Sequence, residues 1–221
     1  MTLTPEAVTA AEPTPRQEPS RKPARSAAQP VLEQLFELYP HLFGAEFLPL
    51  KLGIFQDLME GHAGLFERDA LKLALGLHTR STRYLQCVAA GKMRHDLQGV
   101  ATERVAPEHV HHAIMELFRR RQARSQEDLG PKLRRQLIAA FEASGMTRQD
   151  YLTTCHTNDA GANLALEEAL AERDQRLAKQ DALVRTFEAS GKTVEEFSDM
   201  YGMDPRDVHA ALKSLGRDRV L

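Results

Sequence analysis

The side chains whose types and spacing suggest chemistry lie in HTRSTRYLQCVAAGKMRHDLQG, residues 78–99. Four basic residues precede the first acidic residue of this stretch, and they are Arg80, Arg83, Lys92 and Arg94. The wider segment 70–124 holds ten Lys or Arg residues against four Asp or Glu residues, whereas the whole chain has a formal net charge of −2. A local excess of cationic side chains in a nearly neutral chain favours a polyanionic partner at this segment.

The sequence lacks the residue patterns that metal binding, nucleotide binding or catalysis would require. His109, His111 and His112 are close in sequence, but no cysteine or carboxylate stands at a spacing that would complete a zinc site. The pair His95–Asp96 has no carboxylate cluster beside it for magnesium, and no nucleotide-binding glycine loop or nucleophile elbow occurs. We therefore expect no enzyme activity, no metal and no cofactor, and we expect Cys87 to be buried.

Composition is typical of a cytoplasmic protein. Of the 221 residues, 42% are hydrophobic and 27% are charged, which is enough apolar material for a core. No apolar run approaches the length of a membrane span, and the first residues do not read as a secretory signal. The two cysteines form no metal or disulfide pattern. We expect one domain with appendages, or two small domains.

The elements that must position the basic segment are predicted to be mainly helices. Residues 1–30 are rich in Pro, Ala, Ser and Arg, and we expect a disordered tail there. Helical spacing of apolar residues follows in VLEQLFEL, IFQDLME and ALKLALGL, and Ser81 is predicted to cap the short helix TRYLQCVAA. Gly76 inside a helix costs about 1 kcal/mol relative to Ala, which indicates a close approach there.

A β-hairpin and a basic helix complete the region 31–124. KMRHDLQGVATERV, residues 92–105, alternates apolar and polar side chains around Gln98-Gly99, which predicts two strands and a turn. Pro107 opens the helix PEHVHHAIMELFRRRQAR, whose last turns are strongly basic. SQEDLGP, residues 125–131, reads as a linker.

The C-terminal region, residues 132–221, contains an internal repeat. FEASGMTRQDYL at 141–152 aligns with FEASGKTVEEFS at 187–198, a period of 46 residues. The copies, 141–169 and 187–215, are each predicted as helix, Ser-Gly break, Thr-capped helix, turn and helix. The fold is therefore mainly α, with an all-α C-terminal module of two related units. Because this region is net acidic, we favour protein interaction or self-association over accessory RNA binding or DNA reading.

The middle of the chain resembles the ProQ/FinO family of bacterial RNA chaperones. The resemblance is carried by PLKLGIFQDL, ALKLAL, TRSTRYLQCVAAGKMRHDLQG and VAPEHVHHA, in the family's order over about residues 31–122. It implies a compact, mainly helical domain with a small β-hairpin that binds structured RNA, especially terminator hairpins with a single-stranded 3′ U tail. It also implies effects on the stability and pairing of small RNAs and mRNA 3′ ends.

The resemblance assigns candidate RNA-binding positions. Proteins hold A-form duplexes through phosphates and 2′-hydroxyls, for which Lys51 and Arg94 are expected contacts. The helix start at Thr79–Tyr84 is expected to hold the RNA 3′ end, because the first N–H groups of a helix lack intrahelical partners. The full set is Lys51, Arg68, Lys72, Thr79, Arg80, Ser81, Thr82, Arg83, Tyr84, Lys92 and Arg94.

Structural roles remain open for several of these residues. Ser81 can act as a helix cap alone, and Tyr84 can be a half-buried core residue rather than contact a phosphate or stack on a terminal nucleotide. Arg94 faces opposite to His95 in its strand and is expected to project toward the RNA. Asp96 is expected to hold the hairpin or to orient the arginine.

Two positions depart from the family pattern. Gly76 stands where relatives often carry arginine, and His78 replaces a usual tyrosine. The alternative function is a protein-interaction or DNA-binding regulator that acts through the C-terminal repeats, with the middle region as a scaffold. The RNA sequence bound is not predictable, because contacts to backbone and shape carry little sequence information.

Overall fold

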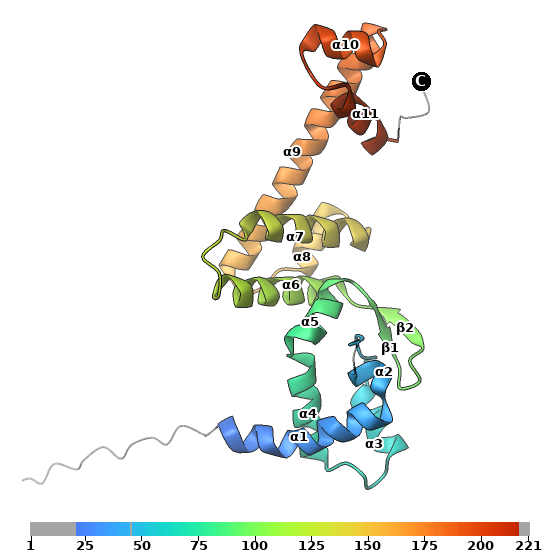
Figure 1. Cartoon of the computed structure of the whole chain (residues 1–221), viewed down its shortest axis with the longest axis vertical. Coiled ribbons are helices and arrows are strands. Elements are labelled where there is room, and N and C mark those ends of the chain that lie inside the picture. The colour runs from blue at the N-terminus through green and yellow to red at the C-terminus, as the bar shows by residue number, and fades with distance from the viewer. Residues whose placement is uncertain (1–20, 45, 217–221) are drawn as a thin grey trace, which may run out of the picture.

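The computed structural model describes residues 21–44 and 46–216 (Figure 1). In chain order its elements are α1 (Arg21–Leu38), α2 (Pro40–Phe43), α3 (Ile54–Gly61), α4 (Arg68–Thr79), α5 (Thr82–Ala89), β1 (Met93–His95), β2 (Ala101–Arg104), α6 (Pro107–Gln122), α7 (Gly130–Ser144), α8 (Arg148–Thr154), α9 (Ala160–Ser190), α10 (Val194–Tyr201) and α11 (Pro205–Ser214). The predicted fold class is confirmed, because helices dominate and a small antiparallel two-stranded sheet accompanies them.

Helix α1 begins earlier than composition predicted. Residues 21–30, which we assigned to the disordered tail, form the first turns of α1, and Pro30 lies inside the helix. Ala28 is fully buried and shares a helix face with Val31 and Leu35, which are also buried. This face packs along α4, so tertiary contacts favour a helix that the local composition disfavours. The prediction for residues 1–20 concerns a part of the chain outside the described residues.

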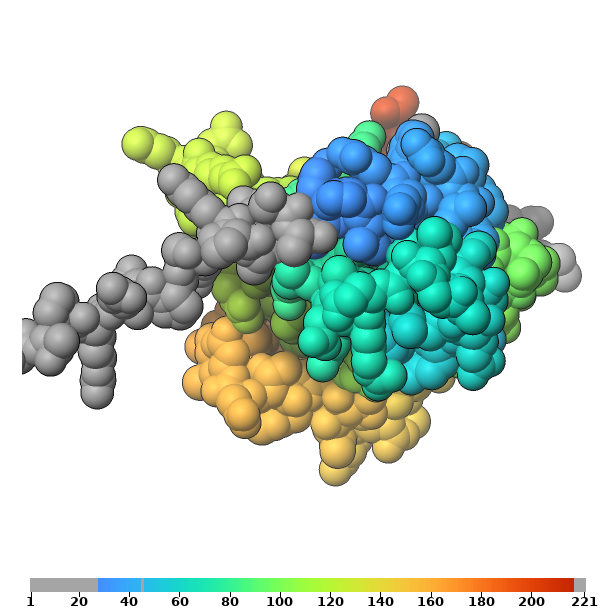
Figure 2. All heavy atoms as spheres, turned by 90° about the horizontal axis from the view of Figure 1, so that it is seen from below, coloured from blue at the N-terminus to red at the C-terminus, as the bar shows by residue number. Residues whose placement is uncertain are grey.

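Side-chain caps fix the first residues of α4 and of α5. The Glu67 carboxylate accepts hydrogen bonds from two backbone N–H groups and caps α4. Ser81 Oγ accepts the backbone N–H of Tyr84 at 3.2 Å and caps α5, which confirms the predicted cap. Figure 2 shows this end of the molecule, where residues 28–44 lie against the α3–α4 region.

Strands β1 and β2 form the hairpin predicted for residues 92–105. Asp96 Oδ1 accepts two backbone N–H groups of the turn, which confirms its predicted role in holding the hairpin. Gly99 has a φ of 77°, and a Cβ atom there would lie 2.8 Å from the ring of His41. On the other edge of β1, the N–H of Lys51 donates to the carbonyl of His95 at 2.9 Å. The hairpin is therefore fixed to the segment before α3.

The hydrophobic core does not divide at the predicted linker. One cluster of buried side chains extends from Ala28 to Leu170 and includes residues of α7, α8 and the start of α9. Helix α6 packs on α5 and also on α7, and it buries Ile114 and Leu117. A second, smaller cluster involves Val184 and residues of α10 and α11. The division between the two cores therefore falls within α9, not at residues 125–131.

The two related sequence segments have the same local conformations. Gly145 ends α7 in the left-handed region and Thr147 caps α8, while Gly191 ends α9 in the left-handed region and Thr193 caps α10. We call α7, α8 and the start of α9 the first unit, and the end of α9 with α10 and α11 the second unit. Helix α9 carries the second unit away from the rest of the molecule (Figure 1).

Candidate functional site

A cavity of about 430 Å³ lies where α4 meets α5, with β1 and α6 forming further walls. The predicted residues that line it are Thr79, Arg80, Tyr84 and Arg94. Apolar side chains, including those of Leu85 and Val88, complete the lining. The predicted helix-start site and the predicted strand site therefore meet in one cavity, which we call the α4–α5 cavity.

Arg94 is a buried cation in the wall of this cavity. Its side chain is 10% exposed, because Nη1 donates to the carbonyl of Leu50 at 2.9 Å and Nη2 lies 3.1 Å from Nδ1 of His109. Contrary to the prediction, the side chain does not project freely from the hairpin, since β1 packs on the segment before α3. Only the edge of the guanidinium that faces the cavity is available to a ligand.

Tyr84 offers its hydroxyl to the cavity more than its ring. The residue is 7% exposed, and its hydroxyl oxygen accepts the N–H of Leu50 at 3.0 Å. The hydroxyl proton remains free to be donated. Burial raises the pKa of this hydroxyl, so it keeps its proton at neutral pH. Tyr84 is thus a core residue, as the structural alternative expected, and of the two RNA roles its geometry favours a hydrogen bond to a phosphate over stacking on a base.

Gly76 makes room for the side chain of Arg80. A Cβ atom at Gly76 would lie 3.1 Å from Nη2 of Arg80, which confirms the close approach predicted at this glycine. The basic group that the resemblance would place at position 76 is therefore replaced by one that reaches the same place from the turn after α4. Arg80 is exposed, and its own carbonyl accepts a hydrogen bond from Arg120 at 2.9 Å.

Arg120 lines the α4–α5 cavity and was not among the predicted residues. Its Nη1 lies 3.4 Å from Oγ1 of Thr82, and its Nε donates to Glu116 at 2.8 Å. This cation stands beside the start of α5, where the backbone N–H groups of Thr82 and Arg83 have no partner within the described residues. The basic end of the helix 107–124 was the available signal, but its position against α5 depends on tertiary packing.

Ser81, Arg83 and Arg68 do not line the α4–α5 cavity, and Arg68 is at the opposite end of α4. Ser81 faces a neighbouring groove, and its hydroxyl is used by the cap. The guanidinium of Arg83 lies over the ring of Phe47, and that of Arg68 lies over Phe55, each 5.4 Å from the ring centroid. These cation–π contacts hold the two arginine side chains against the surface.

The three predicted lysines lie outside the α4–α5 cavity. Lys72 and Lys92 are exposed. Lys51 is partly exposed and its Nζ lies 2.9 Å from the carboxylate of Asp57. This hydrogen bond and the nearby charge raise the pKa of Lys51, so the side chain is cationic at neutral pH.

The site holds charge but no evident nucleophile. The thiol of Cys87 is buried as predicted, donates to the carbonyl of Tyr84 at 2.9 Å, and has its pKa raised by burial to about 11. Within residues 21–44 and 46–216, no group of three or more His, Cys, Asp or Glu side chains is placed to hold a metal ion. No helix in this part of the chain is long and apolar enough to cross a membrane.

Comparisons with known proteins find relatives for part of this chain. A model of the ProQ/FINO family matches residues 25–129. The RNA chaperone ProQ of Shewanella pealeana is 43% identical over 91 residues, which cover 39% of this chain and 43% of that protein. The RNA chaperone ProQ of Shewanella piezotolerans is 44% identical over 87 residues, covering 38% of this chain and 41% of that protein. The chain therefore spans less than half the length of these relatives.

A solved structure shows a more distant likeness. The crystal structure of a FinO-like RNA chaperone from Neisseria meningitidis is 25% identical, with a TM-score of 0.38. The aligned part covers 46% of this chain and 84% of that one.

Proposed function

Since residues 25–129 of this chain belong to the ProQ/FINO family, we propose that they bind structured RNA and that the protein acts as an RNA chaperone. Its ligands in this proposal are small RNAs and mRNA 3′ ends, in particular terminator hairpins with a single-stranded 3′ U tail. Binding would change RNA stability and RNA–RNA pairing, and no bond would be made or broken.

The α4–α5 cavity carries this proposal. It combines the guanidinium groups of Arg80, Arg94 and Arg120 with the hydroxyl of Tyr84. The unpartnered N–H groups at the start of α5 stand beside Arg120. Glu116 is the carboxylate in the lining, and it is already paired with Arg120. Such a set of donors around a helix start suits a phosphate and the hydroxyls of a terminal ribose.

Exposed cations outside the cavity suit the stem of a hairpin. Lys72 and Lys92 are free to follow phosphates, because duplex RNA is bound mainly through its backbone. Lys51 would exchange Asp57 for a phosphate. This exchange costs little, since solvent weakens ion pairs at the surface.

The test compares one terminator hairpin in three forms: intact, with the U tail trimmed, and with a 3′-phosphate. We expect the intact form to bind the full chain most tightly. Arg80→Ala and Arg120→Ala should each weaken binding about tenfold or more, since hydrogen bonds to charged groups are worth about 1.5–3 kcal/mol. Arg206→Ala, which removes an exposed arginine of α11, is the control. Equal affinity for all three RNAs would exclude the 3′-end site.

Arg94 is a poor choice for this test. Its removal would leave the buried carbonyl of Leu50 without its partner, which costs about 1–3 kcal/mol of stability. Loss of binding in Arg94→Ala would therefore mix folding with recognition. Arg80 is exposed, so its replacement reports on binding alone.

The alternative proposal places function in the C-terminal helical repeats, as a protein-interaction or DNA-binding regulator. The same assay with duplex DNA in place of RNA separates the two. Tight DNA binding that survives Arg80→Ala and is lost when α10 and α11 are removed would favour this alternative.

A further inference from the structure

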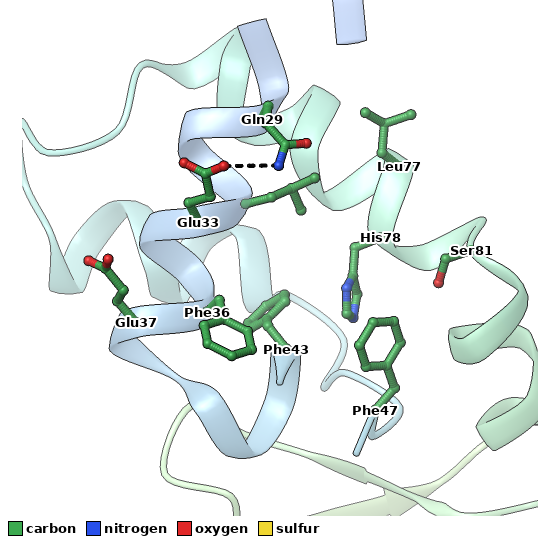
Figure 3. A pocket seen from close by; sticks show the side chains of 10 residues that line it. Gln29, Glu33, Phe36, Glu37, Phe43, Phe47, Leu77, His78 and Ser81 are labelled. Carbon is green, nitrogen blue, oxygen red and sulfur yellow. Dashed lines mark hydrogen bonds between the residues drawn. The ribbon is translucent and has the colours of Figure 1, made fainter. Parts of the chain in front are cut away.

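A groove separate from the α4–α5 cavity lies between α1 and α4 (Figure 3). Its lining residues are Gln29, Leu32, Glu33, Phe36, Glu37, Phe43, Phe47, Leu77, His78 and Ser81. None of these residues lines the α4–α5 cavity. We call this the α1–α4 groove.

Aromatic side chains form the inner part of the α1–α4 groove. The ring of His78 stands between Phe43 and Phe47, with ring centroids 4.6 Å and 4.5 Å away (Figure 3). Phe36 stands at the mouth and is 52% exposed, which is unusual for so large an apolar side chain. His78 and Phe43 are buried, and Phe47 is partly buried beneath Arg83, so the ring that the groove offers most openly to a ligand is that of Phe36.

The charged side chains that line the α1–α4 groove are carboxylates. Glu33 and Glu37 are both exposed on α1 at the rim, and Glu33 accepts a hydrogen bond from Gln29 at 3.0 Å. His78 Nε2 is buried and has no hydrogen-bond partner among the described residues. Burial lowers the pKa of His78 to about 4, so the imidazole is neutral at physiological pH and does not repel a cation.

We propose that the α1–α4 groove is a docking site for an arginine side chain of a basic segment in a partner protein. Aromatic faces attract a guanidinium through cation–π contacts, and carboxylates pair with it. The groove already shows one such contact, because the guanidinium of Arg83 lies 5.4 Å from the centroid of Phe47. Glu33 and Glu37 would repel RNA phosphates, so a protein ligand fits the rim better than RNA.

The experiment uses the full chain labelled for NMR and three blocked amino acids as probes: N-acetyl-arginine methylamide, the citrulline analogue and the leucine analogue. Citrulline keeps the shape of arginine and lacks its charge. We expect saturable shifts at Leu77 and His78 with the arginine probe, and at least tenfold weaker binding of the other two. Equal binding of all three probes, or no binding of the arginine probe, would overturn the proposal.

Substitutions at the rim test the charge directly. The double variant Glu33→Gln, Glu37→Gln should lower the affinity for the arginine probe at least fivefold. Glu60→Gln, which neutralises an exposed carboxylate of α3 outside the groove, should leave binding unchanged. Equal weakening by Glu60→Gln would show that only the overall charge matters and would overturn the proposal.

Hairpin RNA binding is measured with the same variants, so that failure of this proposal can be distinguished from failure of the proposed RNA-binding function. We expect the double variant to keep the RNA affinity of the unmodified chain, and Arg80→Ala to keep the affinity for the arginine probe. If the hairpin displaces the arginine probe, or if the double variant changes RNA affinity several-fold, the α1–α4 groove belongs to the RNA site and the proposal is wrong.

Discussion

At the end of their second helix, the two related units differ in exposure: Cys155 in the first unit is 1% exposed, whereas Tyr201, 46 positions later, is 53% exposed. The same difference occurs just before the two copies, where Leu133 is buried and Lys179, 46 positions later, is exposed. The first unit has apolar side chains on the surface that joins the core formed by residues 28–117. The second unit has polar or exposed residues at those positions and keeps a small core of its own.

The interior of each unit is nevertheless alike. Phe141 meets Tyr151 edge to face with ring centroids 5.2 Å apart, and Phe187 meets Phe197 in the same way at 5.4 Å. An inner aromatic pair thus maintains the helical unit, while residues on its outer face decide what it packs against. The predictions below use matched positions in the two units to test this distinction.

The largest expected effect is on the stability of truncated chains, and it depends on the residue at which the chain ends. A chain ending at residue 124 loses α7 and α8 and exposes the apolar side of α6, so we expect it to aggregate or to unfold at a much lower temperature. A chain ending at residue 176 keeps the whole first core and should keep both the main melting transition and hairpin binding. Circular dichroism and gel filtration measure this, and a stable, monomeric 124-residue chain would contradict it.

Loss of one buried aromatic ring from each unit should lower hydrogen-exchange protection over different parts of the molecule. Tyr151 and Phe197 occupy equivalent positions and are both almost fully buried. Loss of a large buried aromatic side chain costs about 3–5 kcal/mol. We expect Tyr151→Ala to lower hydrogen-exchange protection in α5 and α6, and Phe197→Ala to lower it only in α10 and α11.

Tyr151→Phe is the control for this pair, because it copies the ring of the second unit and removes only a hydroxyl. Its effect should be small, because the buried hydroxyl of Tyr151 has no hydrogen-bond partner among the described residues and none is lost. Lower protection of α6 in Phe197→Ala would show that the two cores are energetically coupled and that the comparison fails.

Acid should destabilise the first core more than the second. The pKa of His78 falls from 6.5 to about 4 on folding because of burial, so the unfolded chain binds more protons than the folded chain between these values. The free energy of unfolding therefore falls as pH falls through this window, by about 2–3 kcal/mol between pH 7 and pH 4.5. Urea unfolding at the two pH values measures it, and His78→Phe should flatten the dependence.

The smallest expected effects are at the helix caps. Thr147 and Thr193 each accept a backbone N–H, and Thr193 also forms a reciprocal capping box with Glu196. Replacement of such a cap by Ala costs about 1 kcal/mol. Thr193→Ala should lower exchange protection in α10 alone, whereas Thr147→Ala should also reduce the stability of the main transition. Identical profiles for the two variants would remove the distinction between the units.

Local features were predictable from neighbouring residues. Ser81 as a cap, the hairpin turn at Gly99, the close approach at Gly76 and the buried Cys87 follow from patterns within a few positions. Features that depend on packing between distant elements were not. Residues 21–30 form a helix because Ala28 reaches α4, and Arg120 lines the α4–α5 cavity because α6 crosses the start of α5.

The sequence by itself determined the family resemblance, the helical character, the repeated unit and most of the basic side chains around the proposed RNA site. The tertiary structure decided which of them share a cavity, that Arg94 is tied into its wall, and that the cores divide within α9. The physical reason is that capping, turn geometry and helical periodicity act within a few residues. Burial and charge pairing depend instead on which faces meet, as when α6 packs on both α5 and α7.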